Sequence, residues 1–161
     1  MTLWVIKGGP FGERDERFRT ESIIGIPWPE VGDLSAYPDR ETLKAAYLAF
    51  HPHVTDGHLN AQVGQMWRFV HRMKVGDPVV VPFRGIREVA VGEISGPYRW
   101  TDAYGSDMPH VRDVRWQVLD LPREAFDQDL LYSFGSSQSV SSASRNHAER
   151  RVRALMGELA W

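Results

Sequence analysis

The 161-residue chain contains no cysteine, which excludes a thiol nucleophile, a zinc finger, an iron–sulfur centre and a disulfide scaffold. It also lacks any apolar run near the roughly 18 residues that a membrane-spanning helix requires, so we expect no membrane partner. The opening residues, Met-Thr-Leu-Trp-Val-Ile-Lys, do not have the layout of a signal peptide. Together these absences favour a cytoplasmic protein that folds around an ordinary apolar core.

A strong charge of one sign is also missing. Nineteen Lys and Arg stand against 21 Asp and Glu, which gives a net charge of −2. The chain is therefore not a polycation that coats nucleic acid, and a nucleic-acid site would need a local basic patch or base contacts. Sixteen of the 19 cations are Arg, a bias that favours phosphate contacts and stacking but equally reflects the codon usage of a GC-rich genome.

Motifs for catalysis and for metal binding are absent. Three histidines fall within residues 51–58, but they occupy a Pro/Gly-containing loop without an H-E-x-x-H pattern, so we expect no metal and no cofactor. The Ser-rich stretch from 133 to 144 contains no G-x-S-x-G elbow. None of the three lysines follows an acidic residue by two positions, which excludes the usual D…(D/E)-x-K nuclease site. The chain is thus predicted to be a non-enzymatic module with no catalytic residues.

Strand and helix patterns predict an α+β fold. Alternating or β-branched segments predict strands, and apolar stripes with caps predict helices. The strands lie too close together in the chain for βαβ units, which favours a small curved sheet or open barrel flanked by helices. We expect strands at 2–7, 22–28, 78–83, 89–94 and 111–119, helices at 39–50, 60–73 and 146–159, and a loop at 136–144.

The chain divides into two predicted parts. Residues 1–135 form the main domain, and residues 136–161 are a Ser-rich loop with a C-terminal helix that packs on it or links to a further domain. Aromatic residues stand at strand ends of the main domain: Trp28 lies between two prolines, and Tyr98 and Trp100 lie in a Gly/Pro loop. Two facing rings make a slot one base thick, and stacking contributes ~1–3 kcal/mol per base. That energy could offset the cost of flipping a base out of a duplex.

Five segments, in this order and spacing, carry a family resemblance: WVIKGG, IIGIPW followed by VGDLS, QVGQMWRFVHRMKVGD leading into VVVPF, VGEISGPYRW, and HVRDVRWQVLDLP. Across residues 4–131 the chain resembles the PUA superfamily, specifically its EVE and YTH branches. It is most similar to the EVE-like N-terminal domains of modification-dependent restriction enzymes. The resemblance implies a PUA-like pseudo-barrel whose aromatic cage holds one flipped, modified base.

The resemblance also implies roles for individual residues. Trp28 is similar to the Trp that closes the second strand of YTH-like proteins. Trp100, helped by Tyr98, is similar to the cage aromatic that follows the G-E-(I/V) strand. The turn at Lys7 and Gly8 resembles the segment whose backbone reads the polar edge of the base. EVE domains often carry an Asn near the start of the central helix, a position for which Asn60, Gln62 and Gln65 compete.

The function that follows is recognition of a modified base in DNA by base flipping, with a nuclease supplied by another domain or subunit. The base would be a methylated or hydroxymethylated cytosine, or N6-methyladenine. The alternatives are a PUA-like RNA-binding domain in RNA modification or decay, and a small hydrolase that uses His110 or His71. Four arginines are candidates for contacts with the flanking phosphates: Arg84, Arg87, Arg99 and Arg112.

Overall fold

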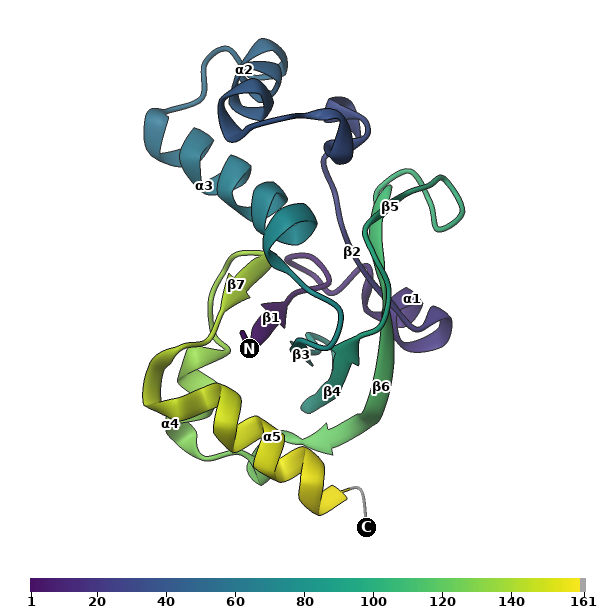
Figure 1. Cartoon of the computed structure of the whole chain (residues 1–161). Coiled ribbons are helices and arrows are strands. Elements are labelled where there is room, and N and C mark those ends of the chain that lie inside the picture. Colours follow the sequence, from purple (N-terminus) through teal and green to yellow (C-terminus); the bar gives the residue numbers. More distant parts are fainter. Residues whose placement is uncertain (160–161) are drawn as a thin grey trace.

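The computed structural model describes residues 1–159, and within them a mixed sheet of seven strands curls into a half-barrel flanked by helices (Figure 1). This confirms the α+β class with a small curved sheet. The strand order is β2-β6-β4-β3-β1-β7, with β5 pairing β6 beside this path. The strands are β1 (Trp4–Ile6), β2 (Ile23–Ile26), β3 (Pro78–Pro82), β4 (Glu88–Ile94), β5 (Arg99–Trp100), β6 (His110–Pro122) and β7 (Val140–Ser142).

The helices are α1 (Asp15–Glu21), α2 (Arg40–Phe50), α3 (Asp56–Trp67), α4 (Gln128–Ser133) and α5 (Ala148–Leu159). The start of α2 is as predicted, because the Asp39 carboxylate accepts a hydrogen bond from the Thr42 amide at 2.8 Å. The predicted start of α3 at residue 60 is wrong. Thr55 caps this helix by accepting from the His58 amide, so α3 begins at Asp56.

Strand β6 determines which chain segments meet. Its first residues pair with β2 on one side and with β5 on the other, and its remaining length pairs with β4. Ile26 and Trp100 are both register partners of His110. The end of β2 and the β5 strand therefore lie at the same end of the sheet, on either side of one histidine.

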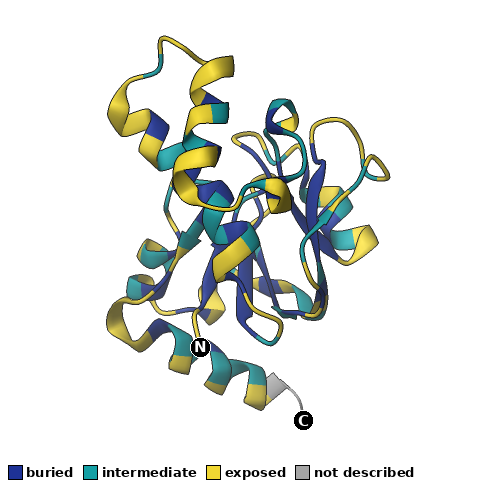
Figure 2. Cartoon of the chain, turned by 45° about the horizontal axis from the view of Figure 1, so that its top comes forward, coloured by how far each residue is buried: buried dark blue, intermediate teal, exposed yellow. Residues whose placement is uncertain are grey.

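Helices cover both faces of the sheet (Figure 2). Trp4 and Ile6 of β1 belong to an apolar cluster with residues of α1, α2 and α3. Leu3 and Val5 belong to a second cluster that includes residues of α4 and α5. Since successive side chains of a strand point to opposite faces, β1 is buried on both sides.

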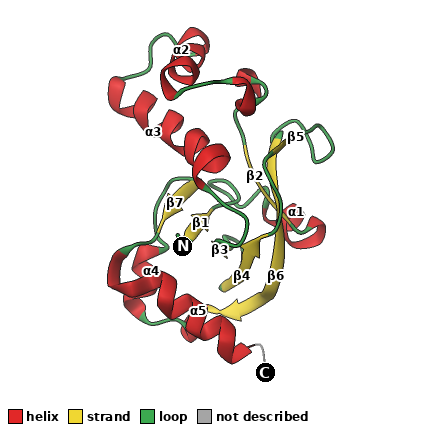
Figure 3. Cartoon of the chain, in the orientation of Figure 1, coloured by secondary structure: helices red, strands yellow, loops and turns green. Residues whose placement is uncertain are grey.

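The prediction of a loop for the Ser-rich segment is wrong for Val140–Ser142. These residues form β7, which pairs antiparallel with β1 at the edge of the sheet (Figure 3). Pairing with an open strand edge decides the structure here, because the local composition carries no strand pattern. Helix α5 then packs on the sheet through the buried side chains of Ala148 and Val152.

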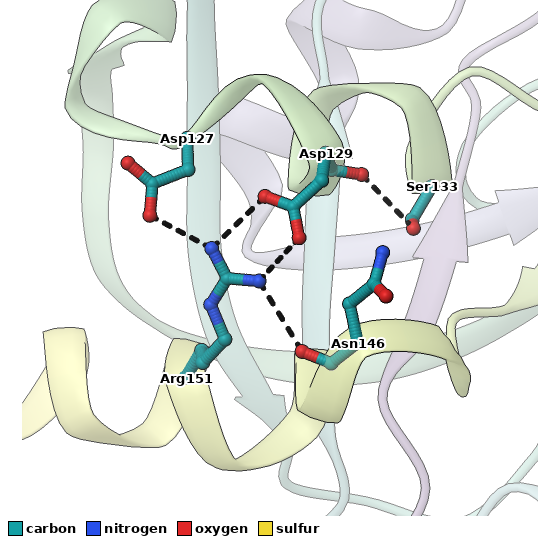
Figure 4. Close-up of polar contacts among 5 residues, drawn as sticks. All are labelled: Asp127, Asp129, Ser133, Asn146 and Arg151. Atoms are coloured by element: carbon teal, nitrogen blue, oxygen red, sulfur yellow. Dashed lines mark hydrogen bonds and ion pairs between the residues drawn. The ribbon is translucent and has the colours of Figure 1, made fainter.

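Arg151 joins α5 to α4 (Figure 4). Its guanidinium donates to Asp127 at 2.7 Å and to both oxygens of Asp129, at 2.5 and 3.0 Å, and to the Asn146 carbonyl at 3.2 Å. The hydrogen bonds from Arg151 hold the pKa of Asp129 below its ordinary value. Within residues 1–159, no helix is both long enough and apolar enough to cross a membrane.

Candidate functional site

Trp100 stands at the mouth of a surface pocket. Its side chain is 55% exposed, an unusual state for an indole, although its backbone is held in β5 by pairing with His110. The pocket has a volume of about 510 Å³, within the ~300–1,000 Å³ typical of small-molecule sites. Its lining is Pro29, Trp100, Thr101, Asp102, Gly105, Ser106 and Pro109.

Trp28 lies beside this pocket but does not line it. Its backbone has a positive φ of 74°, a left-handed conformation that costs a non-glycine residue about 1–2 kcal/mol. Its ring is half-buried against the core, next to the Tyr47 hydroxyl of α2. The pocket wall on this side is Pro29, so the predicted slot between Trp28 and Trp100 is replaced by a pocket with Trp100 and Pro29 in its lining.

Tyr98 is partly buried and packs against the core rather than lining the pocket. Its hydroxyl accepts a hydrogen bond from the Leu34 amide at 3.0 Å and lies 2.7 Å from His110 Nδ1. Its ring packs edge-on against Phe69, with the ring centroids 6.3 Å apart. Burial raises the pKa of Tyr98 far above its ordinary value. Tyr98 therefore fixes the position of β5, and its predicted role as a cage ring does not fit these surroundings.

His110 links the strands behind the pocket. Its side chain is fully buried, and its Nε2 lies 2.9 Å from the Trp28 carbonyl oxygen. Burial lowers the pKa of His110, which keeps the ring neutral at pH 7. A neutral ring can donate from Nε2 to Trp28 and accept at Nδ1 from Tyr98. This arrangement satisfies the buried polar atoms and holds the strained Trp28 backbone in place.

The loop at residues 101–109 is anchored from α1. Arg17 donates to both carboxylate oxygens of Asp107, at 2.7 and 2.8 Å, and to the Tyr104 carbonyl at 2.7 Å. A bidentate arginine–carboxylate pair fixes orientation as well as distance. The pocket wall formed by Gly105 and Ser106 thus stands on a braced loop.

The turn after β1 is tightly folded. The Gly8 carbonyl accepts from the Arg14 amide at 2.8 Å, and the Lys7 amide donates to the Ser139 carbonyl at 3.0 Å. A Cβ on Gly8 would stand 2.0 Å from Asp15 Oδ1 and 3.0 Å from the Asp15 amide nitrogen, so a larger residue here would have to displace the Asp15 carboxylate. Burial lowers the pKa of Lys7, and the neighbouring charge of Arg84 lowers it further. Neither Lys7 nor Gly8 lines the pocket at Trp100.

Arg14 and Asp15 carry polar atoms that are not paired within the described chain. Arg14 is only 4% exposed, yet its Nε and Nη2 have no hydrogen-bond partner among residues 1–159, and the same holds for Asp15 Oδ1. Buried polar groups normally find partners, so these three atoms are exceptions within the described chain. The sequence gives no sign of this, because a run as charged as GERDER is typical of a solvated surface.

The predicted phosphate contacts separate into three exposed or half-exposed arginines and one buried arginine. Arg84 and Arg87 lie in the turn between β3 and β4, where Arg87 is paired with Glu124 at 3.5 Å. Arg99 is paired with Asp113 at 2.7 Å. These three remain candidates for phosphate contacts, since exposed ion pairs are weak and exchange readily.

The prediction that Arg112 contacts a phosphate is wrong. It is 4% exposed, and its guanidinium donates to the carbonyls of Phe69, Met73 and Gly96 at 2.7 to 3.2 Å. With its donors engaged by backbone oxygens, Arg112 has no access to a phosphate. It joins β6 to the segment that follows α3, so its role is structural.

Two further candidates from the sequence have partners within the protein. Gln65, one of the three polar residues in the central helix, is buried and accepts from the Ser139 and Val140 amides at 2.8 and 3.2 Å. His51 pairs with Glu30 at 2.9 Å. In the described part of the chain, no three His, Cys, Asp or Glu side chains come together in a way that could hold a metal ion.

Comparison with known proteins identifies a family. No curated protein matches the chain. A family model matches residues 7–135, which include β2 to β6, the pocket at Trp100 and the turn at Gly8. The family is described as a domain of unknown function (DUF8426), and because the match covers most of the chain, the protein belongs to this family.

Proposed function

We propose that this domain binds DNA and holds one flipped, modified base in the pocket beside Trp100. The base is a methylated or hydroxymethylated cytosine, or N6-methyladenine, and a partner domain or subunit supplies any nuclease. The proposal is carried by one observation, the 55% exposed indole of Trp100 in the lining of a pocket of about 510 Å³. A base stacks on such a face for ~1–3 kcal/mol. The resemblance to EVE and YTH domains, together with the curved sheet, supports the same function.

The chemistry of the pocket suits a base that carries a small alkyl group. Asp102 offers a carboxylate that accepts from the exocyclic amine of cytosine or adenine. Pro29 and Pro109 offer apolar walls for the added carbon. Burying one methyl group contributes only ~0.8 kcal/mol, so selectivity depends on a pocket that keeps its shape.

The hydrogen bonds behind the pocket keep that shape. His110 holds the backbone of Trp28, which precedes Pro29, and Arg17 holds the loop that contains Gly105. Preorganised walls reduce the entropy that binding would otherwise cost. Such a preorganised pocket suits the recognition of a base, a function that needs no catalytic group.

The experiment replaces the stacking ring. Trp100→Ala should weaken binding to a duplex with one modified base by roughly 5- to 150-fold, the equivalent of ~1–3 kcal/mol. Trp100→Phe should retain most of the affinity. Tyr132→Ala serves as the matched control, because Tyr132 is an exposed aromatic on α4, outside the pocket.

The contrast between duplexes decides the outcome. The loss of affinity in Trp100→Ala should be larger for the modified duplex than for the unmodified one, measured by fluorescence anisotropy. Equal losses on both duplexes, or no loss, would contradict base recognition at Trp100. A structured RNA that displaced the modified duplex from the wild-type protein would instead favour the RNA-binding alternative.

A further inference from the structure

A second hollow, here called the basic groove, lies away from Trp100 and has a volume of about 1,060 Å³. Its cations come from separate elements: Arg40 begins α2, Arg68 and Arg72 lie in the π-helical turn that continues α3, and Lys74 follows that turn. Two rings, Trp67 and His71, line it as well. The wall opposite the helices is contributed by β1 and by Asp77.

Two guanidinium groups converge above Gly64 of α3. The point where a Cβ of Gly64 would stand lies 2.9 Å from Arg40 Nη2 and 3.2 Å from Arg68 Nη1. Burial lowers the pKa of Arg68, and the nearby charge of Arg40 lowers it further. Like charges held this close favour an anion that neutralises both.

Protein carboxylates do not neutralise the groove. Its one carboxylate, Asp77, is buried and accepts from the Trp4 indole at 2.9 Å and from the Lys74 amide at 3.0 Å. Across residues 1–159, none of the four cations of the groove takes part in an ion pair. Arg68 Nη2 donates to the Gln138 side chain at 3.3 Å and to the Val140 carbonyl at 3.2 Å, so this guanidinium is partly engaged. Arg40, Arg72 and Lys74 are exposed, and their charges can act on a ligand.

The aromatic pair adds a second kind of contact. The rings of Trp67 and His71 are 4.0 Å apart between centroids, and His71 is exposed to solvent. Burial lowers the pKa of His71, so at pH 7 the imidazole extends the aromatic surface rather than the charge. A groove that combines cations with stacked rings matches the chemistry of single-stranded nucleic acid, whose phosphates and bases alternate along the chain.

We propose that the basic groove binds a single-stranded nucleic-acid segment, with phosphates at Arg40 and Arg68 and at Arg72 and Lys74, and a base against the Trp67–His71 pair. This site differs from the pocket at Trp100 in its residues and its ligand, because it requires no modified base. It stands whether or not the pocket at Trp100 recognises one.

Binding of a fluorescent oligothymidylate tests the groove. The double variant Arg40→Gln/Arg72→Gln removes two exposed charges and should weaken binding by roughly tenfold for each charge-assisted hydrogen bond that is removed. The slope of log K against log salt should fall by about 1.4, because each phosphate neutralised on a single strand contributes ~0.7. The control Arg19→Gln/Arg115→Gln removes the same charge outside the groove and should bind as the wild type does.

Gly64→Ala provides a variant that keeps every charge. The added methyl group displaces the ends of Arg40 and Arg68 from their shared position, so affinity should fall while the melting temperature is maintained or rises, since Ala favours a helix over Gly. The loss of affinity caused by Arg40→Gln/Arg72→Gln should be the same in the wild-type and Trp100→Ala backgrounds, which separates this site from the pocket. Undetectable binding by the wild type, or equal losses in the double variant and its control, would overturn the proposal.

Discussion

The hydroxyl of Tyr98 and Nδ1 of His110 lie 2.7 Å apart, and this hydrogen bond connects the residue that precedes β5 to β6 behind the pocket. His110 Nε2 reaches the carbonyl of Trp28, and the Leu34 amide donates to Tyr98. Four chain segments therefore meet in one line of hydrogen bonds. Each buried polar atom in such a line depends on its neighbour, so removing one member leaves others without a partner.

Removing the Tyr98 hydroxyl should destabilise the protein without changing the lining of the pocket at Trp100. Tyr98→Phe leaves the Leu34 amide and His110 Nδ1 unpaired, and we expect a loss of about 1–3 kcal/mol in the free energy of unfolding. Urea denaturation followed by fluorescence measures it. Tyr132→Phe on exposed α4 should change the free energy little. A Tyr98→Phe protein as stable as the wild type would contradict the structural role of this hydroxyl.

His110 should make the protein less stable as the pH falls below 6.5. Burial depresses its pKa in the folded state below the ordinary value of 6.5, so below that pH the unfolded chain binds the proton more readily. Stability should be constant above pH 6.5 with respect to this group, and should fall as the pH drops from 6.5 towards the folded pKa. His110→Gln should be less stable overall but should flatten this part of the profile.

Thermal unfolding between pH 5 and 8 measures the profile, with His71→Gln as the control, because His71 is exposed and should contribute less. If His110→Gln kept the full wild-type decrease below pH 6.5, the protonation responsible would belong to another group.

Arg112 should behave as a core residue. Arg112→Met fills a similar volume but leaves the carbonyls of Phe69, Met73 and Gly96 without their donor, and we expect a loss of about 3 kcal/mol or more in stability. Arg87→Met, at an exposed position, should be near neutral. Calorimetry distinguishes the two, and an Arg112→Met protein with an unchanged melting temperature would show that these hydrogen bonds contribute nothing net.

The parts of the fold predictable from sequence are those with local periodicity. The helix at 39–50 repeats its apolar residues at helical spacing and has Asp39 as its cap, and both are confirmed. The strands at 78–83 and 89–94 are confirmed as β3 and β4, whose runs of apolar residues are buried at almost every position. Strand β7 is not predictable in this way, because Val140 gains its partner only when β1, more than 130 residues away, presents an open edge.

The candidate site is harder to predict from the sequence than the fold. The sequence shows that Trp100 is an aromatic residue near the end of a strand, but it does not show which residues form hydrogen bonds with the neighbouring Tyr98. Tyr98 resembles a loop aromatic until Leu34 and His110 close around its hydroxyl. Arg14 resembles part of a solvated run, yet the structure buries it. Roles that depend on long-range hydrogen bonds leave no local pattern to recognise.

The brace between Arg17 and Asp107 offers a test of the loop that walls the pocket. The pair is partly exposed, so Arg17→Met should lower the free energy of unfolding by less than ~1 kcal/mol. Amide exchange in residues 101–109 should nevertheless become faster, because the loop is no longer tied to α1. Asp107→Asn should have a smaller effect, because Arg17 still donates to the Tyr104 carbonyl, and the double variant should exchange no faster than Arg17→Met alone. If exchange in this loop were unchanged in Arg17→Met, the loop would owe its position to its own turn at Gly105, and binding at Trp100 would not depend on α1.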